Sequence, residues 1–428
     1  MQQNKNKITF SLFSSFNGFF FIALVLVGFK LDAQVTSSPY SRYGVGDLNR
    51  GTFSQNFSLG NTSIGLRNPG FINIGNPASY SSFDLTVFEV GLNSNVSMFT
   101  SDTSSFTSYH ASFAYLGFGL PITPWWGMSF GVLPFSSIGY NIIHEREIEN
   151  IGLITERYQG SGGVNKVFWG NGLSYRKFSA GFNASYLFGT LTKERRIIFD
   201  PVIPFNTVAI NETSVSDFVF DTGIQFRDSL SEKWVINLGA VYGFRSLTNA
   251  TRQEFVATYE SLPVGDQIKD TVVFENVRGN IVLPQSFGAG FSLESSRLLI
   301  AGDWKYAQWA DFRNFGRSDS LVNNSEFTFG AQFTPDKDAV VSFWKRVQYR
   351  AGARYNTGYL QINNQQISEY GITFGAGLPL RRARTTVNVG FEIGQRGTTR
   401  EGLIREQYIN FNFGMAINDK WFIQRKYD

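Results

Sequence analysis

The chain has 428 residues, of which 16% are aromatic, 17% are charged, 43 are glycine and none is cysteine. The lack of cysteine excludes disulfides, thiolate metal sites and a lipid anchor attached to a cysteine. A net charge of +4, with no run of Lys or Arg, argues against a nucleic-acid partner. A mean hydropathy of -0.13 fits poorly with a bundle of transmembrane helices.

Residues 1–33 have the layout of an export signal. Lys5 and Lys7 give a positive start, residues 16–29 form a short apolar core, and Ala33 is a small residue at the expected cleavage point. The core is too short to favour the alternative, an N-terminal membrane anchor, and no later stretch reaches the roughly 18–20 apolar residues of a spanning helix. We therefore expect a cleaved signal peptide.

Residues 34–84 differ from the rest of the chain because they are rich in Ser, Asn, Gly and Tyr and show little periodicity. Gly and Asn permit tight, irregular turns. The segment also carries more apolar side chains than a typical disordered tail, namely Phe53, Phe57, Leu59, Ile64, Leu66, Phe71, Ile72 and Ile74. We therefore predict that it is a plug, or hatch, inside a barrel.

From about residue 85 onward, apolar residues alternate with polar ones, as in Ile409, Phe411 and Phe413 with Asn410 and Asn412 between them. In a strand, this alternation places the apolar side chains on one face. It predicts about 14 strands, at 85–98, 107–119, 127–140, 164–176, 178–189, 214–227, 233–245, 284–295, 297–308, 324–334, 347–361, 368–378, 384–396 and 405–417.

The connections between these strands sort into two kinds. After every second strand they are mostly short, at 120–126, 177, 228–232, 296, 335–346 and 379–383. The others are often long, at 99–106, 141–163, 190–213, 246–283, 309–323, 362–367 and 397–404. This sorting is typical of an outer-membrane barrel with both termini in the periplasm, whereas a soluble β-sandwich has no reason for it. The 246–283 loop contains extended pieces that suggest a hairpin above the membrane or folded over the mouth.

The predicted fold is therefore all-β: a transmembrane antiparallel β-barrel over residues 85–428, with an N-terminal luminal hatch and a periplasmic C-terminal tail. Gly75-Asn76-Pro77-Ala78, just before the first strand, resembles a motif of the FadL-type outer-membrane transport proteins. The opening residues Ser38–Gly44 and the closing residues Asn418–Phe422 resemble a divergent branch of that family. The resemblance implies a fourteen-stranded barrel closed by a hatch. The chain departs from the pattern in its C-terminal residues 421–428 and in lacking a matching set of ligand-contacting residues.

Charged residues inside the strands are the candidate site residues. A charge that faces lipid costs roughly 2–4 kcal/mol at mid-depth, whereas one that faces the lumen can pair or be hydrated. We therefore expect six charged side chains to line the lumen and to hold the hatch through paired charges, or alternatively to form a conduit for a polar ligand. They are Glu89, Asp303, Lys305, Arg350, Arg354 and Glu392.

Catalysis has little support in the sequence. The two histidines, His110 and His144, fall in the second strand and in the 141–163 loop. A hydrolase would need the His144 loop to converge with a serine and an acid. We predict no enzyme activity, no metal site and no cofactor.

The sequence favours passive uptake of a hydrophobic or amphipathic small molecule, fatty-acid-like or aromatic, through a hatch-gated barrel in the Gram-negative outer membrane. The alternative is a non-transporting structural subunit of an outer-membrane assembly or secretion complex. The expected partners are outer-membrane lipids, with either a small hydrophobic ligand or other envelope proteins. An apolar pocket between hatch and wall would favour uptake, and a lumen filled by side chains would favour the structural subunit.

Overall fold

The computed structural model describes residues 38–149, 152–199, 205–262, 265–380 and 384–420. The predicted signal peptide, residues 1–33, and residues 421–428 of the predicted tail lie outside the described residues. Within the described part of the chain, no helix is both long and apolar enough to cross a bilayer.

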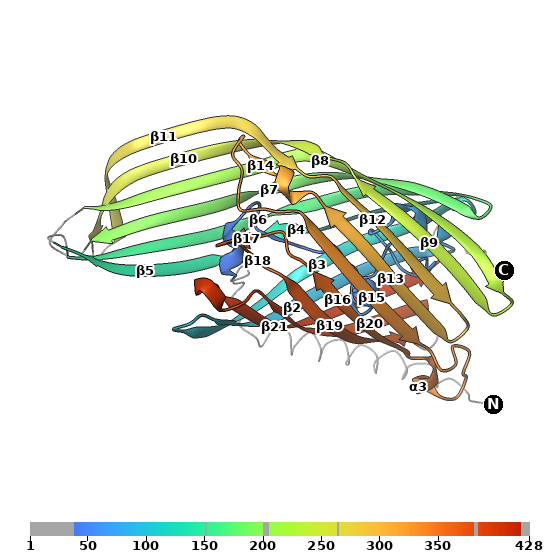
Figure 1. Ribbon diagram of the computed structural model, residues 1–428. Coiled ribbons are helices and arrows are strands. Elements are labelled where there is room, and N and C mark those ends of the chain that lie inside the picture. The colour runs from blue at the N-terminus through green and yellow to red at the C-terminus, as the bar shows by residue number, and fades with distance from the viewer. Residues whose placement is uncertain (1–37, 150–151, 200–204, 263–264, 381–383, 421–428) are drawn as a thin grey trace, which may run out of the picture. The chain divides into compact units, whose positions relative to one another are not determined.

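The described residues form a closed antiparallel barrel of 14 strands (Figure 1). Each strand pairs with the next, and β21 pairs with β2 to close the ring. Every strand predicted from the sequence is present. The strands are β2 (Thr86–Thr100), β3 (Ser105–Thr123), β4 (Trp126–Ser137), β6 (Gly152–Tyr175), β7 (Phe178–Phe199), β8 (Asn206–Ser231), β9 (Trp234–Gly243), β12 (Ser286–Glu294), β13 (Leu298–Ala307), β15 (Asn324–Phe333), β16 (Gln348–Asn356), β19 (Glu369–Pro379), β20 (Arg384–Arg396) and β21 (Arg405–Asp419).

The apolar face of each strand points out of the barrel and the polar face points in. On β19 and β20, Phe374 is 44% exposed and Phe391 is 39% exposed. On β20, by contrast, Asn388 is 1% exposed and Glu392 is 0% exposed. A soluble sandwich has the opposite arrangement, so the outward apolar belt is the one that lipid requires. The fold class predicted from the sequence is confirmed.

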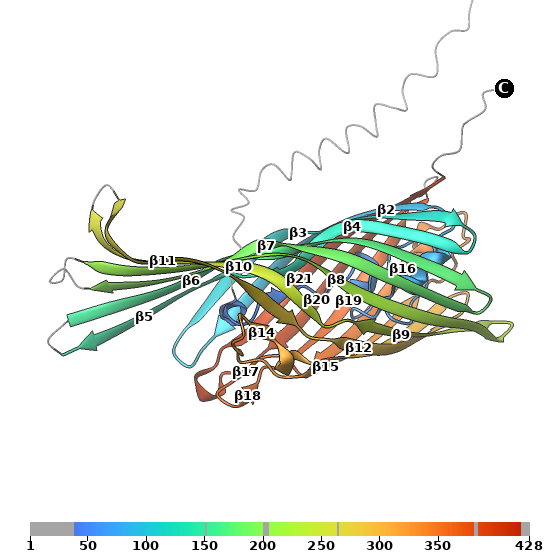
Figure 2. The same ribbon diagram turned by 90° about the horizontal axis from the view of Figure 1, so that it is seen from above.

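Part of the wall continues beyond the barrel as a six-stranded sheet, which we call the extension. It consists of β5 (Tyr140–Ile148), the 152–163 part of β6, the 189–199 part of β7, the 206–215 part of β8, β10 (Ser246–Leu262) and β11 (Gly265–Leu283). Figures 1 and 2 show these strands projecting from one end of the barrel. Gly162 and Gly189 adopt φ values of 97° and 151° where the extension begins.

The extension corrects one prediction and confirms another. Residues 141–163 and 190–213 were expected to be loops, but most of them form strands β5 to β8. The Thr, Val and Ile residues of these two stretches suit strands. Because the stretches lack the apolar stripe of a lipid-facing strand, however, their polar composition resembles that of loops. The hairpin expected within 246–283 is present, because β10 and β11 pair along their whole length.

Short elements pack at the end of the barrel from which the extension leaves, which we call the extension end. They are η1 (Pro39–Arg42), β1 (Asp47–Leu48), η3 (Trp309–Asp311), β14 (Arg313–Asn314), β17 (Gln361–Ile362), β18 (Gln365–Gln366) and η4 (Arg400–Gly402). They share one apolar core, in which Phe312, Leu360 and Ile367 are almost fully buried beside Tyr40 and Ile138. Short turns and α3 (Phe343–Arg346) lie at the opposite end, the turn end.

Candidate functional site

The candidate site is the interface between residues 38–84, which we call the N-terminal segment, and the inner face of the barrel. The segment includes α2 (Ser54–Phe57) and η2 (Pro77–Ser82) but is otherwise irregular. Most of its side chains are buried, and Leu59, Ile64 and Ile72 have no exposed surface. Because these apolar groups lie against strands that are far away in sequence, the segment is part of the folded interior.

Strand glycines allow the segment to approach the wall closely. At many of them an added Cβ would come within 3.0 Å of atoms of the N-terminal segment. At Gly352, for example, the obstruction is the backbone of Leu59 and Gly60, and at Gly239 it is the carbonyl of Ile64. A side chain at either position would push the segment away from the wall. Such glycines occur on β3, β4, β6, β7, β8, β9, β12, β15, β16, β19, β20 and β21.

Two further strands contact the segment through buried carboxylates. On β2, Glu89 accepts a hydrogen bond from the backbone N–H of Ile72 at 2.5 Å. On β13, Asp303 accepts from the N–H groups of Ser63 and Ile64 at 2.6 and 2.9 Å. Carboxylates that accept backbone N–H bonds make strong, charge-assisted contacts. The segment is therefore tied to opposite parts of the ring.

The Gly75-Asn76-Pro77-Ala78 motif lies at the start of η2. The Asn76 side chain accepts a hydrogen bond from the N–H of Ala78 at 3.2 Å, so it caps the short helix. Its amide donates to the carbonyl oxygens of Ile64 and Ile224 at 2.9 and 3.2 Å. Asn76 and Ala78 are both fully buried. The motif thus links the segment to itself and to β8.

An apolar core fills the space between the segment and strands β2, β3, β4 and β6. Phe53, Ile72 and Tyr80 of the segment belong to one buried cluster with Tyr115 of β3 and Phe168 of β6. The rings of Phe53 and Tyr115 have centroids 3.9 Å apart. Side chains rather than open space therefore occupy this part of the interface.

Lys305 and Arg350 reach the segment from neighbouring parts of the wall. Lys305 Nζ lies 3.3 Å from Ser63 Oγ. Arg350 is 3% exposed, and its guanidinium stacks over the ring of Phe71 with 5.8 Å between Cζ and the ring centroid. It donates to Gln332 and Asn388 at 2.7 Å each. In the described part of the chain, no carboxylate lies within salt-bridge distance of it.

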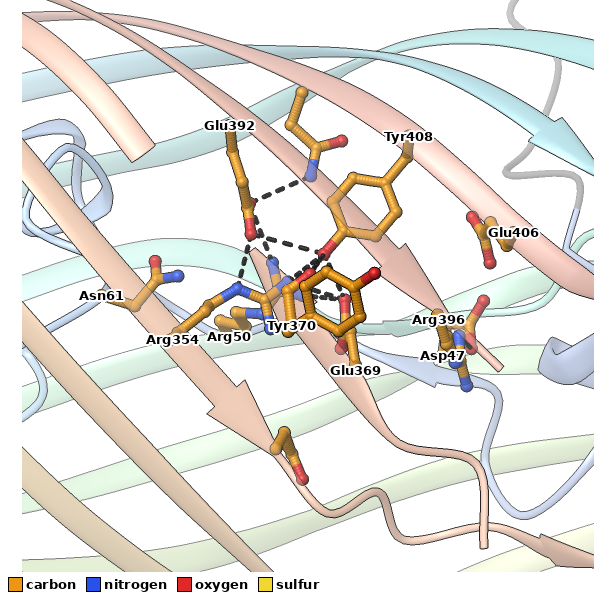
Figure 3. A network of polar contacts seen from close by, with 12 residues as sticks. Asp47, Arg50, Asn61, Arg354, Glu369, Tyr370, Glu392, Arg396, Glu406 and Tyr408 are labelled. Atoms are coloured by element: carbon orange, nitrogen blue, oxygen red, sulfur yellow. Dashed lines mark hydrogen bonds and ion pairs between the residues drawn. The ribbon is translucent and has the colours of Figure 1, made fainter. Parts of the chain in front are cut away.

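Arg354 and Glu392 meet in a buried charge network on four adjacent strands (Figure 3). Arg354 Nε lies 2.5 Å from Glu392 Oε1, and Arg354 Nη2 lies 2.6 Å from Glu369 Oε1. Arg50 of the N-terminal segment completes the network, with Nη2 2.5 Å from Glu369 Oε1. Tyr408 donates a hydrogen bond to Glu369 at 2.8 Å. Two arginines face two glutamates, so the formal charge of the network is zero.

Electrostatics stabilise the charged form of Arg50. Burial and the nearby Arg354 oppose protonation, but Glu369 and Glu392 outweigh them and raise the pKa of Arg50 above its ordinary value. The side chain is still 29% exposed, so the pair is less costly to bury than the fully buried Arg354–Glu392 pair.

The structure places all six predicted charged residues on the inner face of the wall. Five of them contact the N-terminal segment directly, namely Glu89, Asp303, Lys305, Arg350 and Glu392. Sequence reasoning missed the partners that complete the network, which are Arg50, Glu369 and Tyr408. Arg50 lies in a segment without periodicity, and Glu369 lies at the first residue of its strand, so neither position carries a signal of its own.

The two histidines lie apart from this interface. His110 is on β3, and His144 is on the exposed strand β5, where Glu156 of β6 is its pairing partner. Among the described residues, no group of three or more His, Asp or Glu side chains is arranged to hold a metal ion.

Comparisons with known proteins place the fold. Similar solved structures include the monoaromatic hydrocarbon channel CymD (12% identity, TM-score 0.55, covering 88% of this chain and 99% of that one). A second is the toluene transporter TodX of P. putida (15% identity, TM-score 0.55, covering 86% of this chain and 98% of that one). A third is a Pseudomonas aeruginosa FadL homologue (10% identity, TM-score 0.57, covering 86% of this chain and 98% of that one). At such identities the likeness establishes a shared fold alone, so the FadL-type resemblance holds at that level.

No curated protein matches the sequence. A protein-family model described as BamG matches residues 16–428. Because this match spans nearly the whole sequence, the chain belongs to the BamG family.

Proposed function

We propose that the protein is a structural, non-transporting subunit of an outer-membrane complex and that it holds a partner protein on the extension. The observation that carries the proposal is the exposed surface of β11. Val272 and Phe274 are 64% and 66% exposed, and every residue from Gly265 to Val272 is exposed. Successive strand residues point to opposite faces, so both faces of β11 are uncovered over this stretch.

This surface lies where lipid does not explain it. β10 and β11 extend beyond the ring that β8, β9 and β12 close, at the end opposite the short turns. Short turns lie on the periplasmic side of outer-membrane barrels, so in this proposal the extension is extracellular. Apolar groups that stay exposed to water typically mark a contact surface for another molecule. Between Gly265 and Asn280, β11 pairs only with β10 among the described strands, so its outer edge also offers backbone groups.

The filled interior favours the same function. The N-terminal segment packs against the strands of the ring, and a second apolar core closes the extension end. Moving the segment would expose the charge network of Arg50 and Arg354 and separate many backbone contacts at once. The packed N-terminal segment holds the strands that carry the extension in place. This rigidity suits a barrel that serves as a platform for a partner.

Site-specific photo-crosslinking in living cells tests the proposal. A photoreactive phenylalanine analogue at Phe274 should form an adduct with a discrete protein. The matched control is Phe374, a phenylalanine on the lipid-facing belt with 44% exposure. We expect a protein adduct at position 274 and none at 374. Adducts at neither position, or the same adducts at both, would contradict the proposal.

We propose hatch-gated uptake of a hydrophobic small molecule as the second candidate. Its support is the shared fold with channels described as carrying monoaromatic hydrocarbons or toluene. In this function, the N-terminal segment rearranges within the barrel, and the gradient of the ligand drives its passage.

A reversible lock on the segment separates the two candidates. Ser58 Oγ lies 2.6 Å from the position that a Cβ on Gly390 would take, and a disulfide joins Cβ atoms about 3.5–4.5 Å apart. The chain has no cysteine, so Ser58→Cys/Gly390→Cys introduces a single pair. In proteoliposomes, uptake of toluene or a fluorescent fatty acid that stops on oxidation and returns on reduction would support transport. No uptake above protein-free vesicles in either state would exclude it.

A further inference from the structure

A polar cavity of about 510 Å³ lies between the extension and the loops at the extension end of the barrel. Its floor is one face of the extension, where three rows of paired residues follow one another. Lys193, Asn211 and Glu254 form the middle row, and Arg252 lies in the row nearer the barrel. Residues 42–44, Asn314 and residues 317–319 form the opposite wall.

The cavity is rich in cations. Five line it, against three acids, Glu194, Glu254 and Asp319. The cations are Arg42, Lys193, Arg195, Arg252 and Arg317. Of these, only Arg195 has a carboxylate within salt-bridge distance in the described part of the chain, namely Glu156 at 3.2 Å.

Two of the acids already have partners. Glu194 pairs with Arg196, which is outside the cavity lining. Asp319 accepts a hydrogen bond from the backbone N–H of Gly44 at 2.7 Å. Five cations against three acids leave an excess of positive charge, so the cavity has a positive potential.

The remaining contacts of the cations are with neutral groups. Lys193 Nζ donates to the carbonyl oxygen of Arg42 at 2.7 Å, and Arg252 Nη2 donates to Asn314 Oδ1 at 3.1 Å. Burial is the main cause that lowers the pKa of Lys193. The nearby Arg42 and Arg252 lower it further, and Asp319 opposes them. Burial and the nearby Arg317 likewise lower the pKa of Arg252, and Glu254 opposes them. An anion would relieve this repulsion.

We infer that this cavity binds a small anionic ligand, a sugar-sized molecule that carries a phosphate or a carboxylate. Arginine forks suit these anions because they donate two parallel hydrogen bonds. The Tyr158 ring, with the Arg42 and Arg195 guanidinium carbons 5.2 and 5.4 Å from its centroid, supplies a flat surface beside the charges. The volume is within the range of about 300–1,000 Å³ that small-molecule sites occupy.

This inference goes beyond the proposed partner-holding function and does not depend on it. The same ligand chemistry has two sources outside the cell: a free phosphorylated or carboxylated sugar, and the headgroup of an anionic glycolipid in the outer leaflet. The experiment therefore includes both.

Calorimetric titration of the purified full-length protein in detergent tests the inference. Glucose 1-phosphate and glucuronate are the soluble probes, glucose is the uncharged control, and a phosphorylated glycolipid in mixed micelles is the lipid probe. The test variant is Arg42→Gln/Arg317→Gln, because both side chains are exposed and neither forms an ion pair in the described structure. The matched control is Arg278→Gln, an exposed arginine on β11 outside the cavity lining.

We expect saturable binding of at least one anionic probe and none of glucose. A hydrogen bond to a charged group contributes about 1.5–3 kcal/mol, so affinity should fall at least about tenfold in the double variant. It should stay unchanged in Arg278→Gln. Binding of the lipid probe alone assigns the headgroup as ligand, and binding of a soluble probe assigns the free sugar. No binding of any anion, or equal loss in the control variant, would overturn the inference.

Discussion

Arg50 and Glu392 are 342 residues apart in the chain, yet Arg50 Nη1 lies 3.4 Å from Glu392 Oε2 inside the barrel. This contact joins the N-terminal segment to β20, near the C-terminal end of the ring. Its neighbours Arg354 and Glu369 belong to the two strands before β20. One cluster of charges therefore links the N-terminal segment to several strands of the barrel wall.

Glu392→Gln is expected to destabilise the folded barrel strongly. The substitution leaves Arg354, which has no exposed side-chain surface, without one of its two carboxylates. Breaking a buried pair by removing one partner costs about 3–5 kcal/mol. Thermal unfolding in detergent, followed by circular dichroism, measures the loss.

The matched control is Glu294→Gln at the rim. Glu294 faces Arg227 at 3.8 Å, and both side chains are about 40% exposed, so its loss should cost about 0–1 kcal/mol. Equal effects of the two substitutions would show that the internal network adds nothing to stability.

Gly352→Ala is expected to displace the N-terminal segment without opening the barrel. The new methyl group would overlap the backbone of Leu59 and Gly60, which cannot rotate away as a side chain can. The segment should then become accessible to trypsin, which cleaves after Arg50 and Arg67, and limited proteolysis measures the rate of cleavage. In Gly70→Ala, the added Cβ meets nothing closer than 3.6 Å. That variant should therefore be cleaved by trypsin as slowly as the parent protein. An unchanged rate in Gly352→Ala would contradict the close contact.

Asp303→Leu should loosen the segment near Ser63. The carboxylate accepts two backbone hydrogen bonds, and leaving the N–H groups of Ser63 and Ile64 buried without an acceptor costs about 1–3 kcal/mol for each group. Asp303→Asn keeps one carbonyl oxygen and should lie between the parent and Asp303→Leu in thermal stability. If Asp303→Asn were the less stable variant, hydrogen-bond acceptance would not be the role of this residue.

The sequence predicted the ring well because lipid imposes a strict pattern. Phe374 and Phe391 have to face hydrocarbon, so their spacing reveals the strands. The extension lacks such a regular apolar alternation, and strands such as the 206–215 part of β8 were therefore interpreted as loops. The direction of Arg354 and Glu392 was also predictable, because a charge in a membrane strand has to face inward. Their pairing with Arg50 was not, since it depends on the path of an irregular segment.

Shortening the β10–β11 hairpin is expected to leave the barrel intact and to remove partner binding. Arg252 and Val277 face each other in the paired register, so residues 253–276 can be replaced by a two-residue Asn-Gly turn. The ring closes below this point, through the pairing of β9 with β8 and β12. The unfolding temperature of the barrel should therefore stay close to that of the parent. A partner that crosslinks at Phe274 in the full chain should no longer co-purify with the shortened one. A collapse of thermal stability would mean that the extension is a structural part of the barrel, and co-purification that persists would place the partner elsewhere on the protein.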